Sequence, residues 1–316
     1  MLVIAAVSAS LEAPRLAHQP FSGAAVELGD APAALDRTVS RVASNLLGSH
    51  LGFDTNIYPG DTAMDAWRES GDYEWVGYYL KAPCHSDGSW SGTRDRLVDK
   101  GWGLAVIYVG QQTWGGKLTS AAATKKPAAA AKSKKSKSSH KARGRTMTRR
   151  STAPVAKAGA RCSAAFVNSM QGQIDARDAI AKASGEGFPK GTVVFLDVEY
   201  MTSVQKPMRD YYRAWTRTVL ADGRYQPGIY AHTRNAQTIY SDVSDVYDDL
   251  GIDTEPPFWI AGSNGFSPGR APTDVGHKFA SAWQGALDVV RTHNGVKLPI
   301  DISVASVASP SLATTQ

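Results

Sequence analysis

Short apolar strings alternate with segments of helical periodicity from residue 51 onward. Eight of these strings are rich in β-branched and aromatic residues and are bounded by Gly, Pro, Asn or Asp, which is typical of strands. They span residues 51–56, 75–82, 103–110, 191–200, 226–233, 257–262, 279–285 and 298–306. Five helical segments follow the first five strands, at 61–70, 92–100, 163–184, 207–221 and 235–250. This alternation predicts βα units and a parallel sheet.

The connections between the last three strands are short and rich in Gly, Pro and Asn, without a helical period. Eight strands with helices confined to the earlier connections predict an α/β fold, an irregular TIM-type (β/α) barrel whose last strands lack helices. Closure of such a barrel makes the first and last strands neighbours. Functional residues are then expected at the C-terminal ends of the strands.

Segments outside the alternating pattern complete the predicted organisation. Residues 1–31 have no period and are interpreted as a disordered or targeting segment, although MLVIAAVSAS lacks the basic residues of a good export signal. Residues 32–50 are predicted to hold a lead-in helix that packs on the barrel, and its apolar positions are Leu35, Val39, Val42 and Leu46. The barrel covers residues 51–308, and 309–316 form a tail. No apolar run approaches the ~20 residues needed to cross a bilayer.

A basic low-complexity segment interrupts the barrel at residues 117–161. It holds 14 Lys or Arg and no Asp or Glu, and its Ala, Ser and Thr cannot build a packed core. Without these 14 charges the net charge falls from +6 to −8, so the high pI belongs to the segment. We expect a solvated loop insertion. An alternative role is binding to an anionic polymer, without sequence-specific readout because interleaved aromatic residues are missing.

Two carboxylates lie at the end of the most continuously apolar of the predicted strands. Asp197 and Glu199 are two residues apart in FLDVEY, so their side chains project to one face, about 7 Å apart along the strand. A carboxyl pair in unequal surroundings keeps one acid protonated and its neighbour ionised near neutral pH. The pair indicates acid/base chemistry, glycoside hydrolysis first. A structural pair satisfied by Arg or backbone N–H groups is the alternative.

Further acids and aromatic residues occur at comparable places on other strands. Asp54 follows the first strand and Asp301 lies within the eighth, so barrel closure predicts that both face Asp197 and Glu199 across one groove. A sugar presents apolar faces and hydroxyl edges, to which Tyr and Trp are suited. Singly, each aromatic residue is also compatible with core packing. The candidate sugar-contacting residues are Tyr79, Tyr108, Tyr230, His232, Trp259, Trp283 and Gln284.

Other chemistries lack their motifs in this sequence. The GWG string is not a dinucleotide fingerprint, no Ser lies in a GxSxG elbow, and the seven histidines show no paired ligand spacing. We therefore expect no metal and no cofactor. The two cysteines, Cys84 and Cys162, are compatible with one disulfide or with two free thiols.

The strings GFDTN, GWGLAVIYVG, FLDVEY, PGIYAHT, PFWIAG, AWQG and PIDIS occur in this order. Their order resembles the glycoside-hydrolase-like domain formerly called DUF1906 (Rv2525c-like), a relative of the GH25 lysozymes. The resemblance covers residues 51–306 apart from the insertion and implies an eight-stranded barrel with five helices. It implies that Glu199 is the general acid and that Asp197, Asp54 and Asp301 complete the catalytic carboxylates.

The same resemblance implies a disulfide between Cys84 and Cys162 in an exported protein, because related domains place paired cysteines similarly; free thiols are expected in the cytosol. Two departures alter the sugar-contacting residues. The last strand reads DIS where the lysozymes have Asp-x-Asn, and the third strand lacks their aromatic and His pair.

The function predicted from the sequence is hydrolysis of a cell-wall polysaccharide of the peptidoglycan type by an exported monomer in the periplasm, the cell wall or the extracellular space. The alternative is a non-catalytic wall-binding or carbohydrate-binding module with a basic, polyanion-binding loop. Turnover measured beside polymer binding separates the two.

Overall fold

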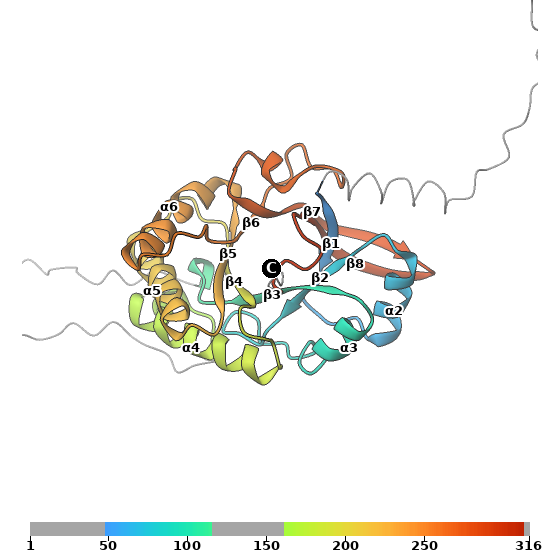
Figure 1. The fold of residues 1–316 in the computed structure, drawn as a ribbon, viewed down its shortest axis with the longest axis horizontal. Coiled ribbons are helices and arrows are strands. Elements are labelled where there is room, and N and C mark those ends of the chain that lie inside the picture. The colour runs from blue at the N-terminus through green and yellow to red at the C-terminus, as the bar shows by residue number, and fades with distance from the viewer. Residues whose placement is uncertain (1–47, 116–160, 313–316) are drawn as a thin grey trace, which may run out of the picture.

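Eight strands close into one barrel in chain order (Figure 1). The computed structural model describes residues 48–115 and 161–312. The closed barrel confirms the fold predicted from the alternating pattern. The strands are β1 His50–Asp54, β2 Trp75–Tyr79, β3 Gly103–Val109, β4 Val193–Val198, β5 Gln226–His232, β6 Phe258–Ala261, β7 Ala280–His293 and β8 Val296–Ala305.

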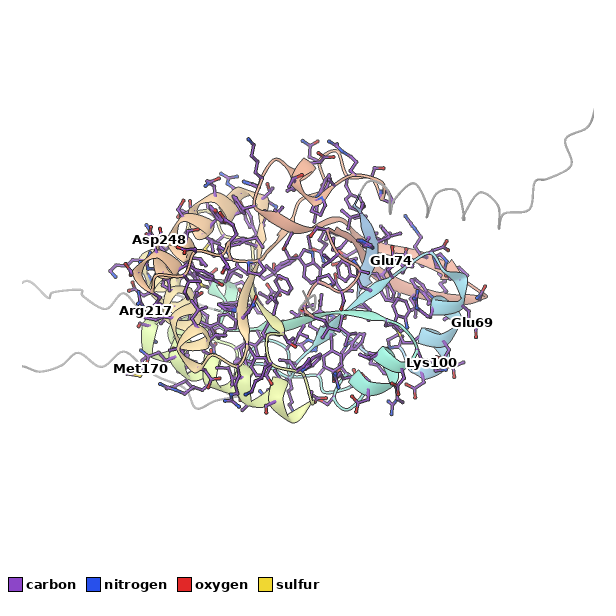
Figure 2. The ribbon with its side chains drawn as sticks, in the orientation of Figure 1. Glu69, Glu74, Lys100, Met170, Arg217 and Asp248 are labelled. Atoms are coloured by element: carbon purple, nitrogen blue, oxygen red, sulfur yellow. A yellow bond between two sulfur atoms is a disulfide. The ribbon has the colours of Figure 1, made fainter. Side chains whose placement is uncertain are left out.

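In Figure 1 the α-helices lie at the left, lower and right sides of the barrel, and the connection beside β6 and β7 at the top holds none of them. The α-helices of the described ranges are α2 Asp61–Ser70, α3 Arg94–Asp99, α4 Ser169–Gly185, α5 Lys206–Asp222 and α6 Thr233–Asp249. The same ranges also contain three short 3-10 helices, η1 Thr113–Gly115, η2 Ala164–Phe166 and η3 Pro272–Val275. Figure 2 shows the exposed side chains of Glu69, Arg217 and Asp248 at the outer surface of the helices.

Helix α4 begins at Ser169, later than the predicted start at residue 163. Asn168 explains the difference, because its extended backbone ends the preceding loop and its Oδ1 accepts a hydrogen bond from the N–H of Gln171 at 3.1 Å. Such a cap satisfies one of the free N–H groups of the first helical turn. The residues before it form η2 instead of helix.

The eighth strand runs antiparallel to both of its neighbours, β7 and β1, whereas the other adjacent pairs are parallel. The prediction of a wholly parallel barrel was therefore wrong. β7 continues to His293 and β8 starts at Val296, so only Asn294 and Gly295 connect them. Both have positive φ, 45° and 79°, as a tight hairpin turn requires. A parallel return needs a much longer crossover.

Aromatic side chains fill the barrel interior below the predicted site. The ring of Trp259 packs edge-on against Trp75 and Phe195, with centroids 5.4 and 5.9 Å apart. Gly52 makes room for this layer, because a Cβ there would lie 2.1 Å from the indole of Trp75. The interior is thus packed rather than open, and the space for a ligand lies above this layer.

Several predicted segments fall outside the described residues: the N-terminal segment 1–31, the lead-in helix 32–50 except its last three positions, and the basic segment 117–161 except Arg161. The first residues of the predicted tail are described and pack on the barrel. Ser311 is fully buried, and its Oγ accepts the N–H of Val106 at 2.6 Å. No helix in the described ranges combines the length and apolar character needed to cross a bilayer.

Candidate active site

The four predicted acids line one cavity at the C-terminal ends of the parallel strands. Its outer part encloses about 320 Å³ and is lined by Asp54, Asp197, Glu199 and Asp301, among others. A deeper part of about 80 Å³ lies between the same four acids. Its wall continues to Tyr79, Ile107, Tyr230, Trp259 and Gln284. Barrel closure thus brings together acids that are up to 247 residues apart in the chain.

Each acid owes its position to a strand. Asp54 is the last residue of β1, and its register partner on β8 is Asp301. Asp197 lies in β4, and Glu199 follows the last residue of that strand. The alternation of side chains along a strand places Asp197 and Glu199 on the interior face, where both line the cavity.

Gln284 connects the acids of β1 and β8. Its Nε2 donates to Oδ2 of Asp54 at 2.8 Å and to Oδ2 of Asp301 at 3.3 Å. The hydroxyl of Tyr230 donates to Oε1 of Gln284 at 2.6 Å, so both ends of the amide are hydrogen-bonded. Tyr79 donates to the second oxygen of Asp54 at 2.7 Å. Both oxygens of Asp54 are therefore hydrogen-bonded inside the protein.

A bulged segment of β7 completes the surroundings of Asp301. The register between β7 and β8 shifts on both sides of Ala286, and Asp288 adopts a positive φ of 51°. This conformation brings its backbone N–H within 2.6 Å of Oδ1 of Asp301. Bulges frequently redirect groups toward active sites, and here the bulge adds a fifth carboxylate, Asp288, to the cavity wall.

Burial and mutual repulsion raise the pKa values of the acids. Burial, followed by the charge of Asp301, raises the pKa of Asp54 from 3.8 to about 7, against the opposing hydrogen bonds of Tyr79 and Gln284. Burial also raises the pKa of Asp301, opposed by the N–H of Asp288 and assisted by the charge of that residue. Carboxylates sharing a buried site cannot all ionise together.

The acid pair of β4 shows the same effect. Burial, then the charges of Glu199 and Asp54, hold the pKa of Asp197 well above its usual range. Burial likewise raises the pKa of Glu199, which a backbone hydrogen bond from Tyr200 partly offsets. Oδ1 of Asp197 is buried and has no hydrogen-bond partner among the described residues. These surroundings therefore favour the protonated form of the pair, and Oδ1 of Asp197 is an unused acceptor.

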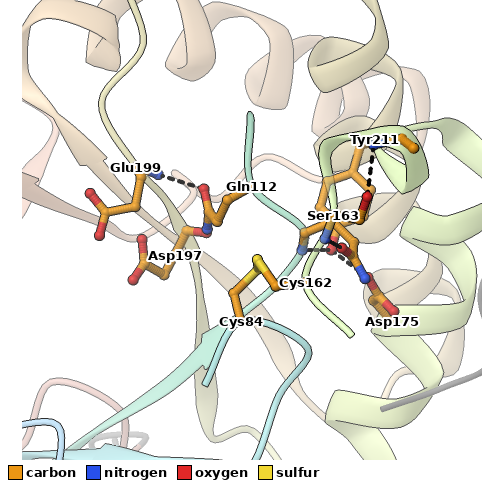
Figure 3. The surroundings of a disulfide bond; sticks show 10 residues. Cys84, Gln112, Cys162, Ser163, Asp175, Asp197, Glu199 and Tyr211 are labelled. Carbon is orange, nitrogen blue, oxygen red and sulfur yellow. Dashed lines mark hydrogen bonds between the residues drawn. A yellow bond between two sulfur atoms is a disulfide. The ribbon is translucent and has the colours of Figure 1, made fainter. Parts of the chain in front are cut away.

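The loop after β3 contributes two residues that the sequence reasoning missed. Gln112 is 1% exposed and hydrogen-bonds the backbone of both Asp197 and Glu199 (Figure 3). Trp114, in η1, lines the outer cavity and is 61% exposed. The string QQTW directly after a buried strand was the available signal. Polar and aromatic residues at that position face the C-terminal mouth of a barrel.

A disulfide borders the cavity. Cys84 lines the outer part of the cavity. It is bonded to Cys162, 78 positions further along the chain. Figure 3 shows it beside the acid pair and Gln112. The bond joins the segment after β2 to the segment before η2.

Four of the seven candidate sugar-contacting residues line the cavity, namely Tyr79, Tyr230, Trp259 and Gln284. The other three do not appear in its wall. Tyr108 is fully buried and donates to Asp178 of α4 at 2.8 Å, so it faces the helices. Trp283 is also fully buried and packs against Phe266.

The third, His232, caps helix α6. Its Nδ1 accepts the N–H of Arg234 at 3.1 Å, and its ring packs edge-on against Tyr200, with centroids 5.1 Å apart. Tyr108 and Trp283 differ from the other candidates for a simple reason. Successive side chains alternate between the two faces of a strand, and these two residues occupy the outer face, Tyr108 toward α4 and Trp283 toward the connection between β6 and β7.

Three solved structures resemble this chain at low sequence identity. An uncharacterized protein of B. stearothermophilus has 18% identity and a TM-score of 0.47, over 81% of this chain and 95% of its own. The Tat-secreted protein Rv2525c of Mycobacterium tuberculosis, in complex with L-tartrate, has 14% identity and a TM-score of 0.42 over 81% and 94%. GHIP, a glycosyl hydrolase 25 of Streptococcus pneumoniae, has 10% identity and a TM-score of 0.47 over 85% and 92%. At these values the three structures carry no functional inference.

No curated protein matches the chain at a significant level. A family model does match, over residues 65–305, which include Asp197, Glu199 and Asp301 and begin after Asp54. The match covers most of the barrel and agrees with the resemblance noted from the sequence strings. The chain belongs to the Rv2525c-like, glycoside hydrolase-like domain family.

Proposed function

We propose that this protein is a glycoside hydrolase that cleaves a cell-wall polysaccharide of the peptidoglycan type. The observation that carries the proposal is the convergence of four carboxyl groups with raised pKa values in one cavity. Acid-catalysed cleavage of a glycosidic bond needs one protonated carboxyl and one carboxylate close to the sugar. Membership of a glycoside hydrolase-like family supports the same chemistry.

Glu199 is the proton donor in this proposal. It lies in the outer as well as the deeper part of the cavity, so an incoming sugar can reach it. Burial raises its pKa, which keeps it protonated at higher pH than an exposed glutamate. Its proton would pass to the glycosidic oxygen as the bond from that oxygen to the anomeric carbon breaks. A water molecule would then add to the anomeric carbon and give up a proton to a carboxylate of the site, which completes the hydrolysis.

Asp197 is proposed to hold the sugar. Its unpartnered, buried Oδ1 needs a donor, and a bound ligand can supply one from a hydroxyl or an amide N–H. The 2-acetamido group of an amino sugar offers such an N–H, which favours an N-acetylated polymer. Donation from the ligand would stabilise the carboxylate form and lower the pKa of Asp197 on binding.

Asp54 and Asp301 are proposed to act through their charge. Gln284 donates to both, so the two acids are held side by side with at least one able to ionise. A negative charge at this place favours the positive charge that develops at the anomeric carbon. Tyr79 donates a hydrogen bond to Asp54, and the backbone N–H of Asp288 donates one to Asp301. Because these bonds fix the orientation of both carboxyl groups in advance, little rearrangement is needed during the reaction.

The cavity also supplies apolar surface for sugar rings. Trp114 presents a largely exposed ring at the outer cavity, and stacking on a pyranose would cover it. Tyr79, Tyr230 and Trp259 border the deeper part. Action on a wall polymer places the protein outside the cytoplasm in this proposal, and the disulfide is compatible with an oxidising compartment.

The deciding experiment compares wild type with Glu199→Gln on purified sacculi and chitin oligomers. Removing the proton donor should lower the release of reducing ends at least ~100-fold, while polymer pull-down persists. Glu69→Gln, at an exposed glutamate of α2, is the matched control and should keep full activity. Retention of most activity by Glu199→Gln would contradict the assignment. A wild type that binds the polymers without releasing reducing ends would favour the carbohydrate-binding module.

A further inference from the structure

The hydrogen-bond ladder between β3 and β4 stops just before the end of the acid-bearing strand. The last paired residues are Val109 of β3 and Asp197 of β4. On the other side, the pairing of β4 with β5 continues through Val198. Beyond this pair β3 offers no register partner to Val198 or Glu199, which leaves a place beside the end of β4.

The side chain of Gln112 occupies that place. Its Nε2 donates to the C=O of Asp197 at 2.8 Å, and its Oε1 accepts the N–H of Glu199 at 3.2 Å (Figure 3). In a parallel pair of strands, a residue on one strand donates its N–H to the C=O of a residue on the other strand. Its own C=O accepts the N–H of the residue two positions further along that other strand. The amide of Gln112 reproduces this pattern opposite Val198. It behaves as one additional ladder residue of β3.

Burial makes these two hydrogen bonds important. Gln112 is 1% exposed, so water cannot replace a lost partner. The opposite amide orientation would set two donors against each other at Glu199 and two acceptors against each other at Asp197. Both bonds therefore specify a single arrangement of the strand end that carries the two acids.

The loop that carries Gln112 is anchored by its neighbours. The N–H of Gln111 donates to the hydroxyl of Tyr211 at 2.9 Å, and this hydroxyl donates to Asp175 at 2.7 Å. Oε1 of Gln111 accepts the N–H of Ser163 at 2.8 Å. Ser163 follows Cys162, which is bonded to Cys84. The residue that holds the side chain of Gln111 therefore follows directly on the disulfide.

We propose that Gln112 is a positioning residue that extends the β3–β4 ladder by its side chain and thereby sets the place of Asp197 and Glu199. The kinetic consequence rests on the proposed function, because it requires turnover by these acids. The structural consequence does not rest on the proposed function. Without the amide, the peptide N–H of Glu199 loses its partner and its carboxyl moves relative to Asp197.

Two variants and one control test this role. Gln112→Met keeps an unbranched side chain of similar size and removes both hydrogen bonds. Gln112→Glu keeps the acceptor for Glu199 but can donate to Asp197 only when it is protonated. Gln173→Met makes the first substitution at a half-buried glutamine of α4 that lies outside the chain of hydrogen bonds from Gln111 through Tyr211 to Asp175.

The first measurement is hydrogen exchange of the Glu199 backbone amide by NMR, which does not depend on activity. In Gln112→Met we expect the protection of this amide to fall at least ~10-fold, because its hydrogen-bond partner is lost. Gln173→Met should leave that protection unchanged. In Gln112→Glu, the ionised carboxylate is repelled by the C=O of Asp197 and is displaced from the strand end, so the protection should be low at high pH. It should recover toward the wild-type value as the pH is lowered and residue 112 takes up a proton.

The second measurement separates kcat from KM on solubilised wall fragments. Misplaced acids should lower kcat of Gln112→Met by ~10 to 100-fold, with KM within about threefold because the sugar contacts remain. The ratio of Gln112→Glu to wild-type kcat should increase at low pH, a pattern that simple destabilisation does not produce.

Wild-type exchange at Glu199 together with wild-type kcat in Gln112→Met would overturn the proposal. If Gln112→Met fails to fold, the exchange of the Glu199 amide in Gln112→Glu is measured against pH instead. Protection that does not change with pH in this variant would count against the proposal. A wild type without turnover would refute the proposed function alone, since the exchange of the Glu199 amide still decides the role of Gln112.

Discussion

Asp54 is held more tightly than an ordinary surface carboxylate. It is 4% exposed, and both of its oxygens accept hydrogen bonds, from Tyr79 and Gln284. These bonds favour the ionised form, but burial and the charge of Asp301 outweigh them and raise the pKa to about 7. The pH dependence of stability should therefore report on this residue.

The first prediction concerns Asp54→Asn. Because the folded pKa is raised from 3.8 to about 7, the native state binds a proton between these values that the unfolded state has released. The contribution of Asp54 is thus present at low pH and is lost as the pH rises through this window. Replacing the acid with a neutral amide should flatten this part of the pH dependence.

Urea unfolding at several pH values between 4 and 7 measures the effect. Asp253→Asn, at an exposed aspartate, serves as the control and should follow the wild-type curve. If Asp54→Asn lost as much stability over this range as wild type, the raised pKa would have to be abandoned.

Strand periodicity was sufficient to predict where the four acids meet. Asp197 and Glu199 share a face because they are two residues apart, and the closure of the barrel supplies Asp54 and Asp301. Gln112 and Asp288 could not be predicted in this way. Their positions depend on how β3 leaves the sheet and where β7 bulges, and both result from tertiary packing rather than from a local pattern.

At the scale of elements, the loop after β3 depends on a glycine. A Cβ at Gly110 would lie 2.3 Å from the hydroxyl oxygen of Tyr211 and 2.9 Å from a methyl group of Leu196. The backbone must pass this close for the N–H of Gln111 to reach the same hydroxyl. The glycine is needed for space.

We therefore expect Gly110→Ala to destabilise the protein by about 1 to 3 kcal/mol through overpacking. Gly185→Ala is the control, because Gly185 ends α4 and a Cβ there would meet no atom within 4 Å. Its helix should be unaffected or slightly stabilised. Urea unfolding at one pH compares the two variants.

The double variant Gly110→Ala with Tyr211→Phe removes the hydroxyl that the new methyl group meets. Tyr211→Phe alone also costs stability, because Gln111 and Asp175 lose a buried hydrogen-bond partner. The double variant should therefore lose less stability than the sum of the two single variants, since the closest contact of the new methyl group disappears. Equal stability of Gly110→Ala and Gly185→Ala would show that the loop has more room than the structure indicates.

The sequence patterns located the elements well but did not determine their directions. Apolar strings indicate a buried strand whether it runs parallel or antiparallel. The direction of β8 follows from Asn294 and Gly295, a two-residue turn inside a longer hairpin. That turn signal was present, but the predicted strand ended at residue 285, too early for the turn to connect two strands.

For the molecule as a whole, the described residues on the two sides of the basic segment lie close together on the barrel. The described chain stops at η1 and resumes shortly before η2, and these two short helices contact each other. A short connection can therefore replace the segment. Loops of different length change the closure entropy only slowly.

We expect a variant with residues 117–160 replaced by a short Gly/Ser linker to keep the thermal midpoint of the full chain. It should lose the salt-sensitive binding to anionic polymers that the Lys and Arg residues would provide. A full-length chain with the same Lys and Arg changed to Gln is the matched control for charge. Calorimetry and a polymer pull-down at two salt concentrations measure both properties, and a linker variant that cannot fold would contradict the placement in a loop.

The disulfide also determines what a proteolytic cut would do. Cys84 and Cys162 enclose β3, Gln112 and the whole basic segment in one covalent ring. A single break anywhere in this ring opens it without dividing the molecule, so the product is a two-chain protein joined through sulfur. Gln112 and Glu199 would then belong to different chains when the cut falls in the basic segment. Such a nicked form would remain one particle under oxidising conditions and would depend on barrel packing alone once reduced.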